Sequence, residues 1–96
     1  MMTGHKRIVK YSAKYKKEYT KSKKQGKNIP LLKWVIGQLA DDIPLPANHK
    51  DHPLHGDWRG YRECHITPDW LLIYKKEDNG ELILSLTRLN SHSNLF

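Results

Sequence analysis

Residues 61–89, YRECHITPDWLLIYKKEDNGELILSLTRL, contain three runs that suit strands, separated by two turn signals. The runs are 61–66, 70–76 and 81–89, and the last two are rich in leucine, β-branched or aromatic residues, as is typical of strands. Thr-Pro-Asp at 67–69 predicts a turn between the first two runs, and Asn-Gly at 79–80 is a strong hairpin signal before the third. The stretch therefore predicts three consecutive antiparallel strands.

The residues before this stretch predict one more strand and two helices. Residues 5–11 suit a first strand, and Ser12 suits the N-cap of a helix from residue 13 to about residue 25. Asn28 suits the N-cap of a second helix over 29–41, whose apolar residues recur at helical spacing. The order β-α-α-β-β-β predicts an α+β fold, in which both helices pack on one face of a small, mainly antiparallel sheet.

The length of 96 residues fits a single domain spanning 1–96. The charge is uneven, because 11 of the 17 Lys and Arg residues but only one of the 10 Asp and Glu residues lie in residues 1–33. Such a basic segment is typical either of a solvated helix or of a surface that binds a polyanion such as nucleic acid. Charge alone leaves both interpretations open.

The cysteine content and the hydropathy pattern limit the cellular location. Cys64 is the only cysteine, so the chain has no internal disulfide, and we expect a reducing, cytoplasmic environment. No apolar run approaches the roughly 18 residues that a membrane span requires. We therefore expect no membrane partner.

Titratable residues concentrate just before and within the first of the three runs. Four of the six histidines lie between residues 49 and 65, and histidine both accepts and donates protons near neutral pH. In a strand over 61–66, Glu63 and His65 share one face, whereas Cys64 points to the other. A solvated outer face explains Glu63 and His65 as well as an acid–base site does, so the strand pattern alone leaves both alternatives open.

The spacing of His49, His52 and His55 resembles a metal cluster. Pro53 and Gly56 interrupt any helix that would align them, and zinc sites also use cysteines or well-placed carboxylates, so we predict no metal and no cofactor. Cleavage of RNA without a metal needs a base, an acid and a cation near the phosphate. Histidines, carboxylates and arginines supply those groups here.

Three blocks of the chain together resemble one known family. They are IPLP at 43–46, KDHPLHGDWRGYRECHITPDWLLIYK at 50–75 and SHSNLF at 91–96, and they closely resemble the YafQ branch of the RelE/ParE toxin superfamily. The resemblance extends over essentially the whole chain and implies the RelE-like α+β fold. It also implies the toxin of a type II toxin–antitoxin system, a ribosome-dependent endoribonuclease that cleaves mRNA in the ribosomal A site and so inhibits translation.

The resemblance implies which residues form the site. The matching catalytic positions are His52, His65, Asp69 and His92. Either His65 or His52 would act as the general base. The general acid would be His92, alone or together with Asp69. The positions expected to contact RNA through phosphates or bases are Arg62, Glu63, Trp70, Arg88 and Phe96.

The resemblance also implies partners. They are the ribosome with its mRNA and a cognate antitoxin similar to DinJ or RelB, which we expect to be acidic and partly disordered when free. One alternative is a ParE-like toxin that inhibits DNA gyrase, although gyrase binding needs no histidine–aspartate set. Another is a basic RNA- or ribosome-binding module without catalysis. An mRNA cleavage assay that contains ribosomes separates both alternatives from the nuclease.

Overall fold

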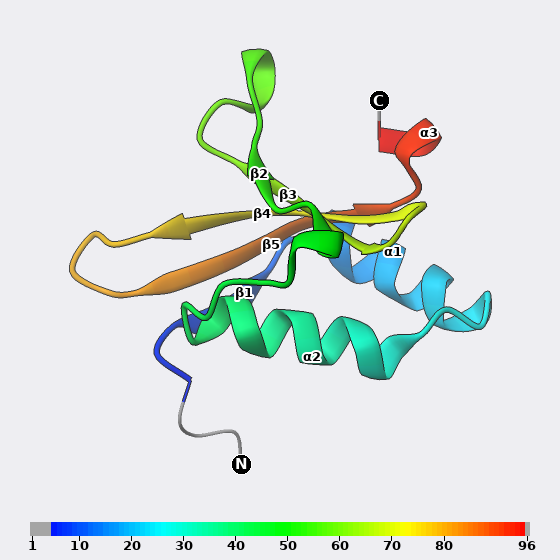
Figure 1. Cartoon of the computed structure of the whole chain (residues 1–96), viewed down its shortest axis with the longest axis horizontal. Helices are drawn as coiled ribbons and strands as arrows, with labels where there is room; N and C mark the ends of the chain where they lie inside the picture. Colours follow the sequence, from blue (N-terminus) through cyan, green and yellow to red (C-terminus); the bar gives the residue numbers. More distant parts are fainter. Residues whose placement is uncertain (1–4, 96) are drawn as a thin grey trace.

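The computed structural model describes residues 5–95, within which five strands form one sheet in the order β1-β5-β4-β3-β2 (Figure 1). The strands are β1 Ile8–Tyr11, β2 His52–Pro53, β3 Arg62–Thr67, β4 Trp70–Glu77 and β5 Ile83–Asn90. The helices are α1 Ala13–Lys24, α2 Ile29–Ala40 and α3 His92–Leu95, with short 3-10 helices η1 Ala47–His49 and η2 Gly56–Trp58. β1 runs parallel to β5 and the other pairs are antiparallel, which confirms the predicted fold class.

Both long helices begin at the predicted N-cap residues. Ser12 Oγ accepts a hydrogen bond from the backbone N–H of Tyr15 at 2.9 Å, and Asn28 Oδ1 accepts one from the N–H of Leu31 at 3.1 Å. These bonds satisfy N–H groups that lack partners within the first helical turn. Gly26 follows α1 with a φ of 76°, a left-handed conformation that favours glycine.

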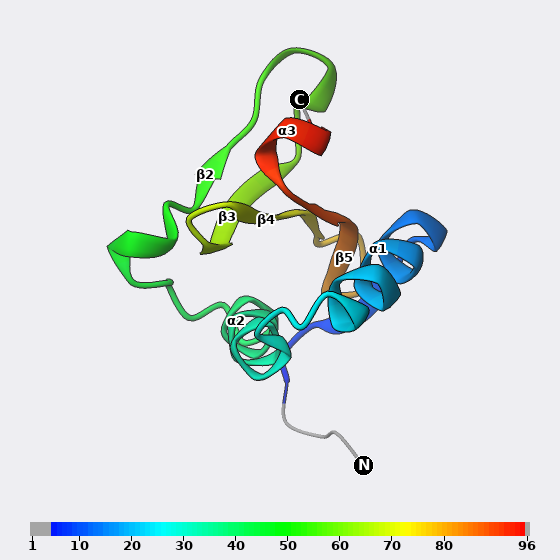
Figure 2. The same ribbon diagram turned by 90° about the vertical axis from the view of Figure 1, so that its right-hand side faces the viewer.

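The two long helices lie on the same side of the sheet (Figure 2), and a cluster of buried apolar side chains packs between them and the sheet. The helices contribute Tyr15, Leu32, Val35, Leu39 and Ala40, and the sheet contributes Cys64, Ile66, Trp70, Leu72, Tyr74, Leu84, Leu86 and Leu89. Cys64 is fully buried, as the strand alternation predicts. Glu63 and His65 alternate with Cys64 and therefore lie on the opposite face of the sheet.

Two short elements differ from the sequence prediction. Residues 52–53 form β2 where a turn-rich segment was expected, and residues 92–95 form α3 where a polar tail was expected. A two-residue strand and a single helical turn are too short to show a periodic pattern, which explains why the sequence did not reveal them. The predicted β4–β5 hairpin is confirmed, with a loop over 78–82 that is longer than a two-residue turn.

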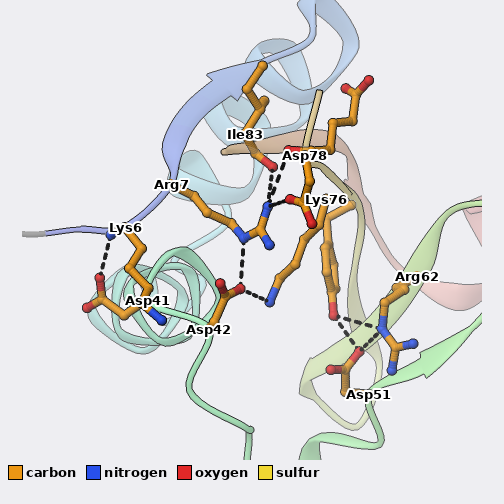
Figure 3. Close-up of polar contacts among 11 residues, drawn as sticks. Lys6, Arg7, Asp41, Asp42, Asp51, Arg62, Lys76, Asp78 and Ile83 are labelled. Atoms are coloured by element: carbon orange, nitrogen blue, oxygen red, sulfur yellow. Dashed lines mark hydrogen bonds and ion pairs between the residues drawn. The ribbon is translucent and has the colours of Figure 1, made fainter. Parts of the chain in front are cut away.

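Arg7 joins the start of β1 to two distant segments (Figure 3). Its side chain is buried, and it donates from Nε to Asp42 Oδ1 at 2.7 Å and from Nη1 to Asp78 Oδ1 at 2.6 Å. Lys76 Nζ also donates to Asp42 Oδ1, at 2.7 Å. The hydrogen bond from Arg7, followed by that from Lys76, lowers the pKa of Asp42 to about 2. The cluster connects β1, the end of α2 and the β4–β5 hairpin.

Replacing Asp42 by asparagine should lower the free energy of unfolding by about 1–2 kcal/mol at neutral pH. Because the folded pKa lies below the ordinary value of 3.8, the contribution of Asp42 is complete above about pH 4 and is lost toward about pH 2. Urea unfolding across this range measures the difference between wild type and variant. Asp57→Asn, at an exposed position, is the matched control. A difference that stays constant down to about pH 2 would contradict this account.

Candidate active site

The face of the sheet opposite the long helices carries two rows of side chains, which the strand register defines. One row crosses β2 to β5 and consists of His52, Glu63, Ile73 and Arg88. The second row crosses β3 to β5 and consists of His65, Leu71 and Asn90. Since neighbouring strands are about 4.8 Å apart, each row fits within roughly 15 Å. In both views, α3 and the segment that contains η2 stand on this side of the sheet (Figures 1 and 2).

Glu63 lies between two histidines. Its Oε1 is 3.4 Å from His52 Nε2 and 3.6 Å from His65 Nε2. Glu63 is only 4% exposed, and its Oε2 is buried without a hydrogen-bond partner among residues 5–95. A buried carboxylate costs free energy unless a positive charge compensates it. Histidine is a side chain that can carry such a charge, and two histidines flank this carboxyl group.

The second ring nitrogen of each histidine faces a backbone carbonyl. His52 Nδ1 is 2.6 Å from the oxygen of Lys50, and His65 Nδ1 is 3.2 Å from the oxygen of Pro68. A carbonyl oxygen only accepts, so each Nδ1 carries a proton, and a neutral ring would turn the lone pair of Nε2 toward Glu63. Each contact with Glu63 therefore needs a further proton, on the ring or on the carboxyl group. The three side chains therefore lie together in an arrangement that general acid–base catalysis can use.

Two residues that the sequence analysis left outside the site support its backbone. His49 is buried, and its Nδ1 lies 2.6 Å from the carbonyl oxygen of His65. Asp51 accepts a hydrogen bond from Tyr74 Oη at 2.5 Å, which fixes the segment immediately before His52. No sequence pattern separates His49 from the other loop histidines, because its partner is a backbone atom 16 residues away.

The two arginines expected to contact RNA lie in different environments. Arg62 is the register partner of Tyr74 and so lies on the helix side, where its Nε is 3.2 Å from Asp51 Oδ1 (Figure 3). The structure does not bring Arg62 to the histidines. Arg88 lies on the histidine side and donates from Nε and Nη2 to Glu18 at 2.9 and 3.0 Å. Only Arg88 is therefore placed in the rows that carry the histidines.

The RNA contacts expected of Glu63 and Trp70 do not fit their burial. Trp70 is 1% exposed and packs in the apolar layer between the helices and the sheet. A base cannot stack on a ring that is not exposed, and the buried carboxyl group of Glu63 offers no surface to RNA. A tryptophan that follows a Pro-Asp turn can face either side of the next strand, so the sequence alone did not reveal the burial of Trp70.

Asp69 and His92 are both exposed. Asp69 lies in the β3–β4 turn next to Pro68, whose carbonyl oxygen contacts His65. His92 begins α3, which follows directly after β5. Phe96 lies outside the described residues, so its expected contact with a base stays a prediction.

Two other kinds of site lack support within residues 5–95. Cys64 is fully buried, and this burial raises the pKa of its thiol, so Cys64 is a core residue rather than a nucleophile. In the same part of the chain, no group of three or more His, Cys, Asp or Glu residues is arranged to hold a metal ion. No helix of the described chain is long and apolar enough to cross a membrane.

Comparison with known proteins identifies relatives over nearly the full length. The mRNA interferase toxin YafQ of Escherichia coli strain K12 is 42% identical over 91 residues, which cover 94% of this chain and 96% of that protein. YafQ in the E. coli DinJ–YafQ toxin–antitoxin complex has a TM-score of 0.84 at 41% identity and covers 95% of this chain and 98% of its own. A metal-bound toxin from Helicobacter pylori has a TM-score of 0.87 at 42% identity, covering 94% and 99%.

The family comparison agrees with these individual relatives. The family model described as the bacterial toxin of type II toxin–antitoxin system, YafQ, matches residues 7–96. That range includes every strand, every helix and both rows of the candidate site. The chain belongs to the YafQ family of bacterial type II toxin–antitoxin toxins.

Proposed function

We propose that this chain is a toxin that cleaves mRNA in the ribosomal A site by metal-independent acid–base catalysis and thereby inhibits translation. The observation that carries the proposal is the contact of one Glu63 carboxyl oxygen with both His52 and His65. Two histidines beside one carboxyl group are side chains that can accept and donate the protons that RNA cleavage moves. The name mRNA interferase, given to the E. coli relatives, supports the same reaction.

The proposed reaction breaks one P–O bond and forms another. A base removes the proton of a 2′-hydroxyl group, the 2′-oxygen attacks the phosphorus, and an acid protonates the 5′-oxygen as it leaves. We assign the base to the group of His52, Glu63 and His65, in which the carboxylate stabilises the imidazolium that forms. His92, alone or with Asp69, is the proposed acid. The products are a cyclic phosphate and a 5′-hydroxyl end.

Arg88 and the lysines of α1 supply positive charge for RNA. Two nitrogens of Arg88 bind Glu18, and the guanidinium has five N–H donors, so donors on Nη1 remain for a phosphate group. A cation at this place stabilises the negative charge that develops on phosphorus. The six lysines of α1 are exposed, and the net charge of +7 favours association with ribosomal RNA.

The experiment that tests the proposal compares one mRNA with and without ribosomes. Purified, metal-stripped protein should cut the mRNA on programmed ribosomes and leave the same free mRNA intact. Equal cleavage of free mRNA would contradict the ribosome dependence. If cells that express the chain stop growing although no mRNA is cut, inhibition of gyrase is favoured. If the protein binds ribosomes but neither cuts mRNA nor arrests growth, a non-catalytic module is favoured.

We also propose that an acidic cognate antitoxin, similar to DinJ, binds in the groove between α1 and α2. The groove has a volume of about 440 Å³ and is lined by Tyr11, Tyr15, Lys16, Tyr19, Thr20, Leu32, Lys33 and Ile36. Aromatic and aliphatic side chains bordered by lysines suit an amphipathic segment with acidic residues at its margin. The complex of E. coli YafQ with DinJ supports a partner of this class.

Lys16→Glu should weaken antitoxin binding by ~10-fold, because it places a like charge at the edge of an acidic segment. Lys17→Glu makes the same charge change on the same helix, at a residue that does not line the groove, and is the matched control. Calorimetric titration with the antitoxin at two salt concentrations measures both affinities. Equal losses for the two variants would mean that overall charge, rather than this groove, attracts the antitoxin.

A further inference from the structure

Glu18 is the one acidic residue of the lysine-rich helix α1, and unlike the lysines it is buried, with 6% exposure. Its Oε1 accepts hydrogen bonds from Arg88 Nε at 2.9 Å and from the backbone N–H of Leu89 at 3.0 Å. Its Oε2 accepts from Arg88 Nη2 at 3.0 Å and from Asn90 Nδ2 at 2.8 Å. The carboxylate thus connects α1 to three consecutive residues at the end of β5.

The hydrogen bonds around Glu18 favour the ionised form of its carboxyl group. Burial alone would raise the pKa of the carboxyl group, but the hydrogen bonds from Arg88, Leu89 and Asn90 outweigh it and lower the pKa. The same hydrogen bond with Glu18 raises the pKa of Arg88. Both groups are therefore charged at neutral pH.

The contacts of Glu18 lie where β5 loses one of its two neighbouring strands, β1. β1 pairs with β5 only as far as Leu86, and Ser12 then takes over by donating from its Oγ to the carbonyl oxygen of Thr87 at 2.7 Å. One helical turn beyond Tyr15, Glu18 binds the free edge N–H of Leu89. Along its last residues, β5 thus still pairs with β4 on one edge, and on the other edge it is held by α1 instead of by β1.

Asn90 extends the connection from α1 to α3. A carboxylate only accepts hydrogen bonds, so the amide nitrogen of Asn90 must face Glu18, and the amide oxygen faces the other way. That oxygen accepts from the N–H of Ser91 at 2.8 Å and from Asn94 Nδ2 at 3.1 Å. A helix of four residues is not stable by itself, so the placement of α3, which begins with His92, depends on such contacts.

We propose that Glu18 and Asn90 are positioning residues for mRNA cleavage, which hold Arg88 and the α3 helix bearing His92 in their working arrangement. Neither residue needs to touch the RNA, and the burial of Glu18 prevents such contact. The inference rests on the proposed function of the site. It adds a second role to α1, whose lysines attract RNA while its one acid orients the groups that act on it.

Asn90→Ala tests the inference, because it removes the link to α3 while the ion pair between Glu18 and Arg88 remains. The single-turnover rate of mRNA cleavage at saturating ribosomes should fall by ~100-fold, the scale expected when a reacting group is displaced by about 1 Å. The ribosome concentration that gives half the maximal rate should stay unchanged, since the lysines remain. Asn79→Ala, at an exposed position of the β4–β5 hairpin, should cleave at the wild-type rate.

A second background separates positioning from a general structural role. If Asn90 acts through His92, adding Asn90→Ala to His92→Ala should cause no further loss of rate. NMR order parameters for residues 91–95 should fall in Asn90→Ala at temperatures where the sheet stays folded. Multiplied losses in the double variant, or a rigid α3 in Asn90→Ala, would overturn the inference.

Two further outcomes are distinguishable. If the wild type cleaves mRNA and Asn90→Ala cleaves it equally fast, only the positioning role is overturned. If the wild type cleaves no mRNA, the proposed function fails and the positioning role fails with it. Asn94→Ala removes the hydrogen bond from α3 to Asn90 and leaves the bond between Asn90 and Glu18 intact. This variant replaces Asn90→Ala in the test if Asn90→Ala does not fold. It should lower the cleavage rate by about 5-fold.

Discussion

His65→Ala is expected to lower the single-turnover rate of mRNA cleavage on ribosomes by ~10²–10⁴-fold, the range that general acid–base groups contribute. The reason is geometric, because His65 Nε2 faces the Glu63 carboxyl group while its Nδ1 is held by the carbonyl oxygen of Pro68. Removing the ring leaves His52 as the only histidine of the group. Quench-flow measurement with saturating ribosomes gives the rate directly.

Controls and a double variant sharpen this prediction. His55 is exposed at the start of the η2 segment, so His55→Ala should cleave at the wild-type rate. Because His52 and His65 serve one carboxyl group, the variant with both replaced should lose little more than the worse single variant. A wild-type rate for His65→Ala would refute the assignment of the base.

Glu63→Gln is expected to change activity and stability in different directions. The cleavage rate should fall by ~10²-fold because a neutral amide cannot stabilise the imidazolium that forms. The free energy of unfolding should stay constant or rise by about 1–2 kcal/mol, because a poorly paired buried carboxylate is replaced by a side chain of the same size. The 3.4 and 3.6 Å contacts to the histidines are longer than good hydrogen bonds and compensate the burial of Glu63 only in part.

The free energy of unfolding and the cleavage rate are both measured on Glu63→Gln, because only the pair of results separates a catalytic role from a structural one. Urea unfolding supplies the stability, and single-turnover cleavage supplies the rate. Glu81→Gln is the matched control, since Glu81 is exposed in the β4–β5 loop and should change neither quantity. If Glu63→Gln lowered stability and rate together, Glu63 would be a structural residue, and its proposed role as the partner of His52 and His65 in catalysis would lose its support.

Much of the fold follows from local patterns in the chain. Periodicity and turn signals predicted α1, α2 and the three strands β3, β4 and β5, because each element is long enough to show its period. The N-caps Ser12 and Asn28 were predicted from side-chain chemistry alone. β2 and α3 were not predicted, because an element of two or four residues is too short to show a periodic pattern.

Apart from the family resemblance, local patterns predicted the site only where a single strand carries it. Strand alternation alone placed Glu63 and His65 on the same face, opposite Cys64. The approach of His52 to Glu63 depends on β2, and the bond of Glu18 to Arg88 joins residues 70 positions apart, so neither contact has a local signature. From the sequence, Glu18 among the lysines is expected to be one more solvated residue, whereas the structure shows that it is buried.

The most direct test of the central claim maps the 5′ ends of mRNA on ribosomes after brief exposure to wild type, His55→Ala and His65→Ala. The account predicts new cuts within coding sequence for wild type and His55→Ala, each cut leaving a 5′-hydroxyl end. It predicts that these cuts disappear with His65→Ala. Equal cutting by His65→Ala, or arrest of translation by the wild type without new ends, would contradict acid–base cleavage by this face of the sheet.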